Sequence, residues 1–446
     1  MGVICLLCSL TGKFLLLIAV ALLILKLYLL LCKGVCTSRR RMDGKTVIIT
    51  GANTGIGKET ALNLARRGAR VILACRDMDK TNQACREIIS KTGNKEVIGH
   101  HIDLSSLQSV RDFARVILTT ESRLDVLVNN AGAAGLSRKR TQDGLQIEMQ
   151  VNHFGPFLLV NLLLVTKDLV VELVHQYALF TVTKDLVVKL VHQYALFTIT
   201  KDLVVELVHQ YALFTITKEL VVDAPCSLGL LKRSAPSRII MVTSLLHTRS
   251  KLDLTSLDAD DWFDDENLYS TSKLANILVA NELARKLRGS VEVASSSFLT
   301  PSDLADSVEI WQQLNDDQIF SIRPAVTSSV VSPREQIDNS PCNLTGVTAN
   351  STHPGFVATE VFRRLRGFRK TLLDIVIKFY AKTPEEGAQT TIYLAASEEV
   401  EGISGKYFVD CKETKTSLRA QNVALAKKLW EKSELLVKMS RDEIHY

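Results

Sequence analysis

The hydrophobic pattern of the chain is regular from Met42 onward: short apolar runs alternate with longer stretches in which apolar residues recur every three or four positions. The short runs predict strands buried on both faces, over Thr46–Thr50, Val71–Cys75, Val97–Asp103, Val126–Asn129, Arg238–Ser244 and Val347–Ser351. The longer stretches predict helices over Gly55–Arg67, Lys80–Lys91 and Leu107–Thr119. This order predicts an α/β fold, a doubly wound parallel sheet that holds ligands at the carboxyl ends of its strands.

Two segments depart from this alternation. Residues 165–228 are a tandem repeat of a 17-residue unit, and residues 290–344 are rich in Ser, Pro, Asn and Asp without periodicity. A shift of 17 residues rotates a helix by about 260° and moves a strand to its opposite face, so the repeats share no apolar stripe. We expect both segments to be insertions in helix-to-strand connections, away from the ligands, with residues 290–344 forming a flexible loop.

An apolar run near the N-terminus, Phe14–Cys32, is long enough to cross a bilayer as a helix of about 28 Å. Basic residues follow it at Lys33 and at 39–41, against Lys13 before it, so the positive-inside rule places the rest of the chain in the cytosol. The alternative is a cleaved signal peptide and a lumenal protein. The net charge of +6 is mild and clusters near apolar stretches, which favours membrane lipid over nucleic acid as a partner. The nine cysteines show neither disulfide-framework nor metal-ligand spacing.

The first candidate site is a glycine-rich loop between the first predicted strand and helix. It is formed by Gly51, Ala52, Asn53, Thr54, Gly55, Ile56 and Gly57. Glycines there permit a tight turn and let a pyrophosphate approach backbone N–H groups at the start of a helix. Strand, loop and helix in this order are the context in which such a motif binds a dinucleotide, as in the Rossmann fold.

Residues at the next strand ends predict which dinucleotide is bound. Cys75 stands where an NAD enzyme usually places a carboxylate, and the guanidinium of Arg76 suits a 2′-phosphate, so we favour NADP(H). In the alternative, Arg76 is solvated and Asp77 binds the ribose. Asp103 ends the third strand, where its carboxylate can accept from the adenine amino group. The other candidates for the adenosine half, which also fit ordinary strand-end turns, are Leu104, Asn130, Ala131 and Gly132.

The candidate catalytic residues are Tyr269, Lys273, Ser244 and Asn152. Tyr269 and Lys273 lie four apart, on one face of a predicted helix. A phenol is a poor acid–base group at pH 7, and a neighbouring ammonium together with an oxidised nicotinamide would lower its pKa. Ser244 could bind the substrate oxygen, and Asn152 could anchor a water beside Lys273. A surface Tyr–Lys pair and a helix cap at Asn152 are the structural alternatives.

The segment after the sixth predicted strand completes the candidate site. Pro354 and Gly355 predict a rigid turn, and the hydroxyl of Thr359 could orient a nicotinamide carboxamide. A basic and apolar stretch follows, ending at Tyr380. It could dip into anionic lipid and cover an apolar substrate pocket, or pack on the core with its arginines in solvent.

In this order along the chain, these motifs resemble the short-chain dehydrogenases/reductases, and in particular their microsomal, NADP-preferring retinol dehydrogenases. The stretches that carry the resemblance are Val71–Asp77, Val151–Gly155, Tyr269–Leu274, Ala349–Gly355, Lys382–Thr390 and Ser404–Phe408. The resemblance implies the fold, the use of NADP(H) and an oxidoreductase acting on retinoids or related aldehydes. Tyr269 is then the general acid/base, and Lys273 lowers its pKa and holds the nicotinamide ribose. Ser244 orients the substrate oxygen, and Asn152 supports a proton relay.

The sequence thus predicts an N-terminal anchor with its basic flank (1–41), a nucleotide-binding half (42–164), a repeat insertion (165–228), a catalytic segment (229–289), a loop insertion (290–344) and a C-terminal part with the substrate-binding region (345–446). We expect a single-pass protein of the endoplasmic reticulum membrane with a cytosolic catalytic domain. Its expected substrate is an apolar alcohol or aldehyde, retinol or retinal first. A steroid or lipid-aldehyde reductase and a non-catalytic cofactor-binding scaffold are the alternatives, and the sequence leaves a homodimer open.

Overall fold

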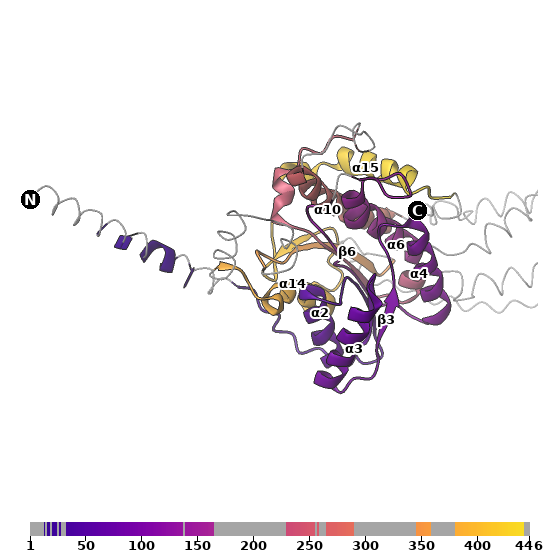
Figure 1. Ribbon diagram of the computed structural model, residues 1–446, viewed down its shortest axis with the longest axis horizontal. Coiled ribbons are helices and arrows are strands. Elements are labelled where there is room, and N and C mark those ends of the chain that lie inside the picture. The colour runs from indigo at the N-terminus through magenta and orange to yellow at the C-terminus, as the bar shows by residue number, and fades with distance from the viewer. Residues whose placement is uncertain are drawn as a thin grey trace, which may run out of the picture.

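The computed structural model of the protein describes residues 13, 16, 17, 20–24, 26, 27, 33–136, 139–164, 229–254, 257, 265–289, 345–357 and 380–440. Within them, eight strands form one sheet in the order β3-β2-β1-β4-β5-β6-β7-β8 (Figure 1). All neighbouring strands pair in parallel except β7 and β8. The strands are β1 (Thr46–Thr50), β2 (Arg70–Cys75), β3 (Val97–His101), β4 (Val126–Asn129), β5 (Ser237–Val242), β6 (Val347–His353), β7 (Tyr407–Val409) and β8 (Lys412–Glu413). The predicted parallel sheet is confirmed, and its strand order reverses between β1 and β4, where such sheets bind ligands.

The central strands are apolar on both sides because helices cover both faces of the sheet. In β1, Ile48 belongs to one hydrophobic core, while Val47 and Ile49 belong to the other, and all three are fully buried. The pairing of β1 with β2 sets Ile48 beside Ile72, which belongs to the same core. Side chains alternate between the faces of a strand, so a continuous apolar run fills two cores at once.

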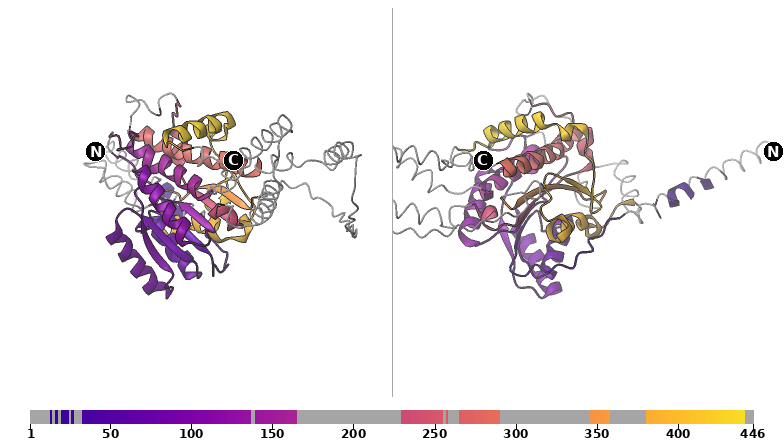
Figure 2. Two further views of the ribbon diagram at one scale, coloured as in Figure 1. Left: turned by 90° about the vertical axis from the view of Figure 1, so that its right-hand side faces the viewer. Right: turned by 180° about the vertical axis from the view of Figure 1, so that it is seen from behind.

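Helices α2 (Gly55–Arg66), α3 (Met78–Thr92) and α14 (Pro384–Ala396) cover one face of the sheet, and α4 (Leu107–Thr120), α6 (Gly155–Leu164) and α10 (Asp265–Gly289) cover the other (Figures 1 and 2). Helix α15 (Val423–Leu436) packs outside α10, where Trp430 meets Phe157 of α6 at a ring-centroid distance of 4.9 Å. The shorter elements are α5 (Ile147–Met149), the π-helical turn η1 (Gln150–Phe154), α9 (Leu230–Arg233), and the 3-10 helices η3 (Leu245–Arg249), η5 (Glu398–Val400) and η6 (Leu418–Gln421).

Each strand and helix predicted over a stated range is present, although some ends differ. The prediction for the third strand was too long: β3 ends at His101. The chain turns at Asp103, whose carboxylate accepts from the Ser105 N–H at 2.9 Å, a local bond that competes with the strand ladder. The prediction for the fifth strand also ran too far, since Ser244 lies after β5 at the start of η3.

Both predicted insertions lie outside the described residues. The described chain stops at Leu164, the end of α6, and resumes at Gly229 shortly before β5. It stops again at Gly289, the end of α10, and resumes at Thr345 before β6. The first gap thus lies between α6 and the short helix α9, which precedes the amino end of β5, and the second lies between α10 and the amino end of β6.

Residues 33–42, named here the N-terminal strap, run along the domain before β1 begins. Lys33 pairs with Glu386 of α14 at 2.6 Å, and the Cys36 N–H donates to Gln389 Oε1 at 3.1 Å. Lys33, part of the predicted basic flank, is thus paired with a carboxylate of α14.

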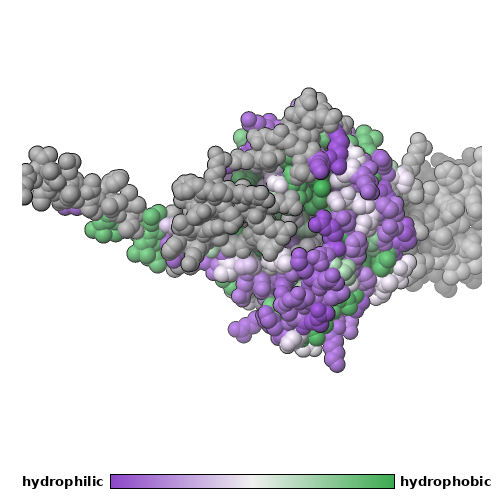
Figure 3. Space-filling model, viewed as in Figure 1, coloured by the Kyte–Doolittle hydropathy of each residue, from purple (hydrophilic) through white to green (hydrophobic). Residues whose placement is uncertain are grey.

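The predicted anchor, Phe14–Cys32, lies partly outside the described residues. Its described positions are helical, and seven of its leucine, isoleucine and valine side chains are between 44% and 67% exposed. They belong to the apolar stretch that projects from the domain at the left of Figure 3. No helix in the described part of the chain is long and apolar enough to span a membrane.

Candidate active site

The glycine-rich loop connects β1 to α2 at the carboxyl edge of the sheet. Gly51 and Gly55 have φ angles of 64° and 59°, in the left-handed region that favours glycine. A Cβ on Gly57 would come within 2.6 Å of the Gly51 carbonyl oxygen, so the loop packs against α2 only because residue 57 is glycine. Thr54, at the N-cap, makes no side-chain capping bond. The first N–H groups of α2 therefore remain for a ligand, and the loop fits a pyrophosphate.

Thr50 and Asn130 tie this loop to the end of β4. Thr50 Oγ1 accepts from the N–H groups of Asn130 and Ala131, both at 3.0 Å. The Asn130 side-chain amide donates to the carbonyl oxygens of Thr50 at 2.8 Å and Gly51 at 3.2 Å. The sequence assigned no role to Thr50, because its partners lie about 80 residues away along the chain. The two residues fix the point at which the strand order reverses.

At the end of β2, the two candidate residues for binding the adenosine ribose or its 2′-phosphate, Arg76 and Asp77, differ in their partners. The buried Cys75 thiol accepts from the Ala52 N–H at 3.2 Å. The Asp77 carboxylate caps α3 by accepting from the Lys80 N–H at 3.1 Å, and this bond lowers the pKa of Asp77. Arg76 is exposed, and within the described residues no carboxylate pairs with it. Arg76 is therefore available to a phosphate, whereas Asp77 already has partners.

The end of β3 places the remaining adenosine candidates. Asp103 is half-buried, and one of its carboxylate oxygens accepts from the N–H and the hydroxyl of Ser105 at 2.9 Å and 2.6 Å. Leu104 is buried against Gly155 at the start of α6. These contacts orient the Asp103 carboxylate, and its bond to an adenine stays a prediction.

Tyr269, Lys273 and Ser244 come together between α10 and the end of β5. Lys273 Nζ lies 5.5 Å from the centre of the Tyr269 ring. The Ser244 side chain lies close enough to the Tyr269 phenol to lower its pKa. Lys273 is only 3% exposed, and its ammonium donates to the Val242 carbonyl at 3.1 Å. The three groups are neighbours, and the buried lysine does not fit the alternative of a solvent-exposed Tyr–Lys pair.

Burial sets the proton affinities of these groups. It raises the pKa of Tyr269 to about 12, against the lowering by the nearby Ser244 side chain. It lowers the pKa of Lys273 to about 8. The pKa of Tyr269 lowered by Lys273 together with an oxidised nicotinamide stays a prediction; among the groups of the chain itself, burial has the largest effect and raises the pKa. The phenol therefore keeps its proton at pH 7, the state required to donate a proton to a developing alkoxide.

Asn152 lies in the π-helical turn η1 and braces the loop after β4. Its side chain accepts from the Ala133 N–H and donates to the Ala133 carbonyl, both at 2.8 Å. Its amide also donates to Ser272 Oγ at 3.1 Å. A Cβ on Gly132 would lie 2.9 Å from Lys273 Nζ and 3.5 Å from Asn152 Oδ1. Asn152 is thus not a helix-start cap. It fixes the segment of Gly132 and Ala133, which packs against Lys273. Short π-helical turns such as η1 are frequent at functional sites.

Glu148 is a residue of the site that the sequence did not single out. It lies one helical turn before Asn152 and is fully buried. Its carboxylate accepts from the Leu136 N–H at 2.9 Å. It raises the pKa values of both Tyr269 and Lys273. The available signal was its spacing from Asn152, but a carboxylate in an apolar helix can equally face solvent.

The turn after β6 lies on the far side of β5 from the glycine-rich loop. His353 Nδ1 accepts from the Leu245 N–H at 3.3 Å, next to Ser244. Gly355 has a φ angle of 93°, a conformation that favours glycine, and the chain bends at the next residue, Phe356, beside the rigid turn that the sequence predicted at Pro354 and Gly355. Thr359 lies outside the described residues, as does most of the stretch leading to Tyr380.

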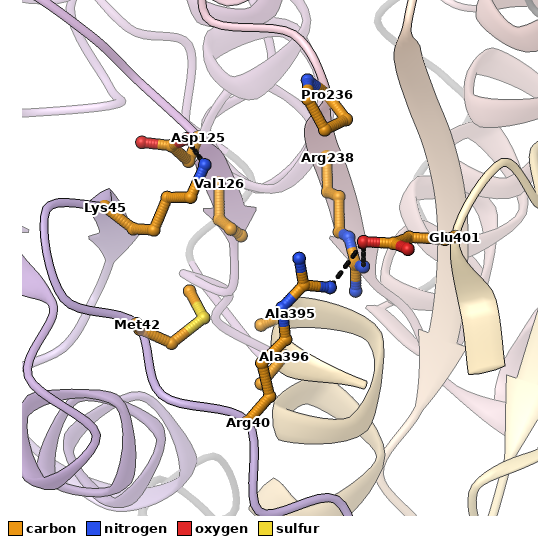
Figure 4. Close-up of a pocket in the computed structure, with 10 residues that line it drawn as sticks. All are labelled: Arg40, Met42, Lys45, Asp125, Val126, Pro236, Arg238, Ala395, Ala396 and Glu401. Carbon is orange, nitrogen blue, oxygen red and sulfur yellow. Dashed lines mark hydrogen bonds and ion pairs between the residues drawn. The ribbon is translucent and has the colours of Figure 1, made fainter. Parts of the chain in front are cut away.

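A pocket at the opposite edge of the sheet lies near the amino ends of β4 and β5 (Figure 4). Its charged side chains pair with one another: Lys45 with Asp125 at 2.9 Å, and Arg238 with Glu401 at 3.7 Å. None of the predicted site residues lines it. We assign no ligand to this pocket.

Known proteins are similar to this chain in sequence and in fold. A family model described as short chain dehydrogenase matches residues 45–168. Retinol dehydrogenase 11 of Homo sapiens is 32% identical over 404 residues, which cover 91% of this chain and 89% of that protein. Retinol dehydrogenase 14 of Homo sapiens is 33% identical over 411 residues, covering 89% and 87%. A crystal structure of an uncharacterised protein from Mycobacterium paratuberculosis matches 91% of this chain and 98% of its own, with a TM-score of 0.52 and 23% identity.

Proposed function

The chain belongs to the short-chain dehydrogenase family, in its retinol dehydrogenase-like branch, and we propose that it transfers hydride between NADP(H) and the pair retinol and retinal. Membership of this family makes the protein an oxidoreductase. The observation that carries the proposal is the convergence of Tyr269, Lys273 and Ser244 at the carboxyl edge of the sheet that also bears the glycine-rich loop. The names of the relatives support a retinoid as the substrate.

NADPH, when bound, supplies the hydride, and the residues of the chain handle the substrate oxygen and its proton. In reduction, the Ser244 hydroxyl donates to the carbonyl oxygen and polarises it. Tyr269 gives its proton to the same oxygen as negative charge develops there, and becomes a phenolate. The ammonium of Lys273, 5.5 Å from the ring centre, stabilises that phenolate. Asn152 supports the return of a proton through a water beside Lys273, and oxidation runs these transfers in reverse.

The choice of NADP(H) rests on the end of β2. Arg76 is exposed there without a carboxylate partner among the described residues, and its guanidinium can bind a 2′-phosphate through two parallel hydrogen bonds. Asp77 accepts from the Lys80 N–H through Oδ1 and pairs with the Lys80 ammonium through Oδ2 at 3.1 Å. In the alternative, NAD(H) with Asp77 as the ribose ligand, the ribose hydroxyls would compete with the Lys80 side chain for this carboxylate.

We expect Glu148→Gln to shift the pH profile of kcat/KM for aldehyde reduction to lower pH, by up to about one unit. The carboxylate raises the pKa values of Tyr269 and Lys273, so a neutral amide lowers both. The amide oxygen can still accept from the Leu136 N–H, which preserves the fold. Glu431→Gln, at an exposed position of α15, is the control. A profile that does not move in Glu148→Gln would show that this carboxylate does not act on the catalytic groups.

We propose a location in the endoplasmic reticulum membrane, with the catalytic domain in the cytosol. The apolar run Phe14–Cys32 and the exposure of its described side chains support an anchor. The basic residues after the run support the cytosolic side. A lumenal protein with a cleaved signal peptide is the alternative. A homodimer stays a prediction; helix α15 lies over α10, so any partner subunit that approaches α10 there would meet α15 first.

A substrate panel tests the retinoid assignment. With NADPH and membranes that contain the full chain, we expect the highest kcat/KM for all-trans-retinal, ahead of a steroid ketone and a medium-chain aldehyde. A higher value for either of the others would replace the retinoid by that class. NADPH binding without turnover of any of the three would favour the non-catalytic scaffold.

A further inference from the structure

A turn between two strands connects the N-terminal strap to the site. Asp410 and Cys411 form the turn between β7 and β8, with left-handed φ angles of 51° and 60°. The Asp410 carboxylate accepts from the Gly34 N–H of the strap at 3.2 Å and pairs with the ammonium of Lys382. A Cβ on Gly34 would overlap the Asp410 carbonyl group. The strap can therefore reach this turn only because residue 34 is glycine.

Lys382 joins the same turn to the residues that follow β6. Its N–H donates to the Phe356 carbonyl at 2.7 Å. Its side chain is 12% exposed, and its ammonium lies 3.4 Å from the Pro354 carbonyl oxygen, to which it donates. A Cβ on Gly355 would lie 2.8 Å from Lys382 Nζ, so the lysine crosses directly over this glycine. The ammonium is thus held between Asp410 and the Pro354–Gly355 turn.

The Pro354–Gly355 turn lies next to Ser244 and not next to the glycine-rich loop. The Thr243 N–H donates to the Thr352 carbonyl at 2.7 Å, and the Leu245 N–H donates to His353 Nδ1 at 3.3 Å. Burial, aided by the nearby Lys382, lowers the pKa of His353 to about 4, so its ring is neutral at pH 7 and can accept this bond. In the sheet, β4 and β5 separate β6 from β1 and its glycine-rich loop. A shift of the Pro354–Gly355 turn would therefore displace the residues on both sides of Ser244, which are Thr243 and Leu245.

We propose that Lys382 and Asp410 are positioning residues for the nicotinamide half of the cofactor. Gly34 contributes to the same positioning, because it lets the N-terminal strap contact Asp410. This rests on the function proposed above. The Asp410 carboxylate compensates the charge of Lys382 and orients it. Without that carboxylate, the ammonium turns toward solvent, the Pro354 carbonyl loses its donor, and the turn is no longer fixed beside Ser244.

The test compares two ligands on the full chain: NADPH, and adenosine 2′,5′-bisphosphate, which keeps the adenine half with its 2′-phosphate but has no nicotinamide. We expect Asp410→Asn and Lys382→Met to weaken NADPH binding about tenfold, or about 1.4 kcal/mol. The affinity for the bisphosphate should change by less than about twofold, because Arg76 and the glycine-rich loop are untouched. Glu413→Gln removes the exposed Lys406–Glu413 pair of the same hairpin and should leave both affinities unchanged.

Gly34→Ala tests the contribution of the strap separately, with the exposed neighbour Val35→Ala as its control. We expect the same selective loss of NADPH affinity in Gly34→Ala and none in Val35→Ala. Lys382→Arg keeps the positive charge and should recover part of the affinity that Lys382→Met loses. Equal weakening of both ligands would reduce these residues to a role in folding, and unchanged NADPH binding would remove them from the site. If the unmodified chain binds the bisphosphate but not NADPH, the proposed function itself fails, and this inference with it.

Discussion

Replacing Tyr269 by phenylalanine is expected to lower kcat for retinal reduction by about 10²–10⁴-fold, the usual contribution of a general acid. The Tyr269 ring lies beneath the Lys273 ammonium and its phenol is close to Ser244, and phenylalanine keeps the ring while removing the proton. The affinity for NADPH should change by less than about threefold, since the substitution leaves the glycine-rich loop and Arg76 unchanged. Single-turnover kinetics and NADPH fluorescence measure the two quantities.

Tyr393→Phe is the matched control for this substitution. Tyr393 uses its hydroxyl in a hydrogen bond, to Glu399 at 2.9 Å, but it lies on α14, on the other face of the sheet. Its loss should leave kcat within about twofold of the unmodified enzyme. Turnover retained by Tyr269→Phe would remove this residue as the acid and with it the proposed mechanism.

The second large effect is expected for Arg76→Asp, which should reverse the cofactor preference. A hydrogen bond to a charged group contributes about 1.5–3 kcal/mol, so loss of the guanidinium alone lowers kcat/KM with NADPH by about 10- to 150-fold. The new carboxylate repels a 2′-phosphate and can accept from ribose hydroxyls, which raises kcat/KM with NADH. The ratio of the two values is the quantity to measure.

Arg86→Asp makes the same change of charge at an exposed position of α3 and controls for long-range electrostatics. Its ratio of NADPH to NADH efficiency should fall far less than that of Arg76→Asp. An unchanged ratio in Arg76→Asp would place Arg76 outside the cofactor pocket. A loss of NADH use in Asp77→Asn without such a change would favour the alternative in which Asp77 binds the ribose.

The fold was predictable because its signals are local. Runs such as Thr46–Thr50 are apolar on both sides, which in a short segment favours a strand covered on both faces. The ends were less predictable: α3 begins at Met78, two residues before the prediction, because Asp77 caps it. An aspartate before a helix is a recognised start signal, but Asp77 also fits the position of a ribose ligand, so the sequence alone does not identify the cap.

The parts of the site that the sequence did not predict depend on contacts between distant segments. Glu148 is identified by its burial beside α10, and Thr50 by its bonds to residues 130 and 131. The raised pKa of Tyr269 follows from burial, which no spacing reports. Asp410 meets Gly34 across 376 positions of the chain. Local patterns identify Tyr269 and Lys273. The groups that shift their pKa values or hold neighbouring segments in place can be identified only from the folded chain.

The measurement that tests the central claim most directly is the NADPH-dependent reduction of all-trans-retinal by membranes that contain the full 446-residue chain. The proposed function predicts that all-trans-retinol forms with one NADPH consumed per molecule, and that Tyr269→Phe membranes form it at least about 100-fold more slowly. Retinol formation at equal rates in both preparations would contradict the assigned active site. No retinol from the unmodified chain, although it binds NADPH, would contradict the retinoid assignment.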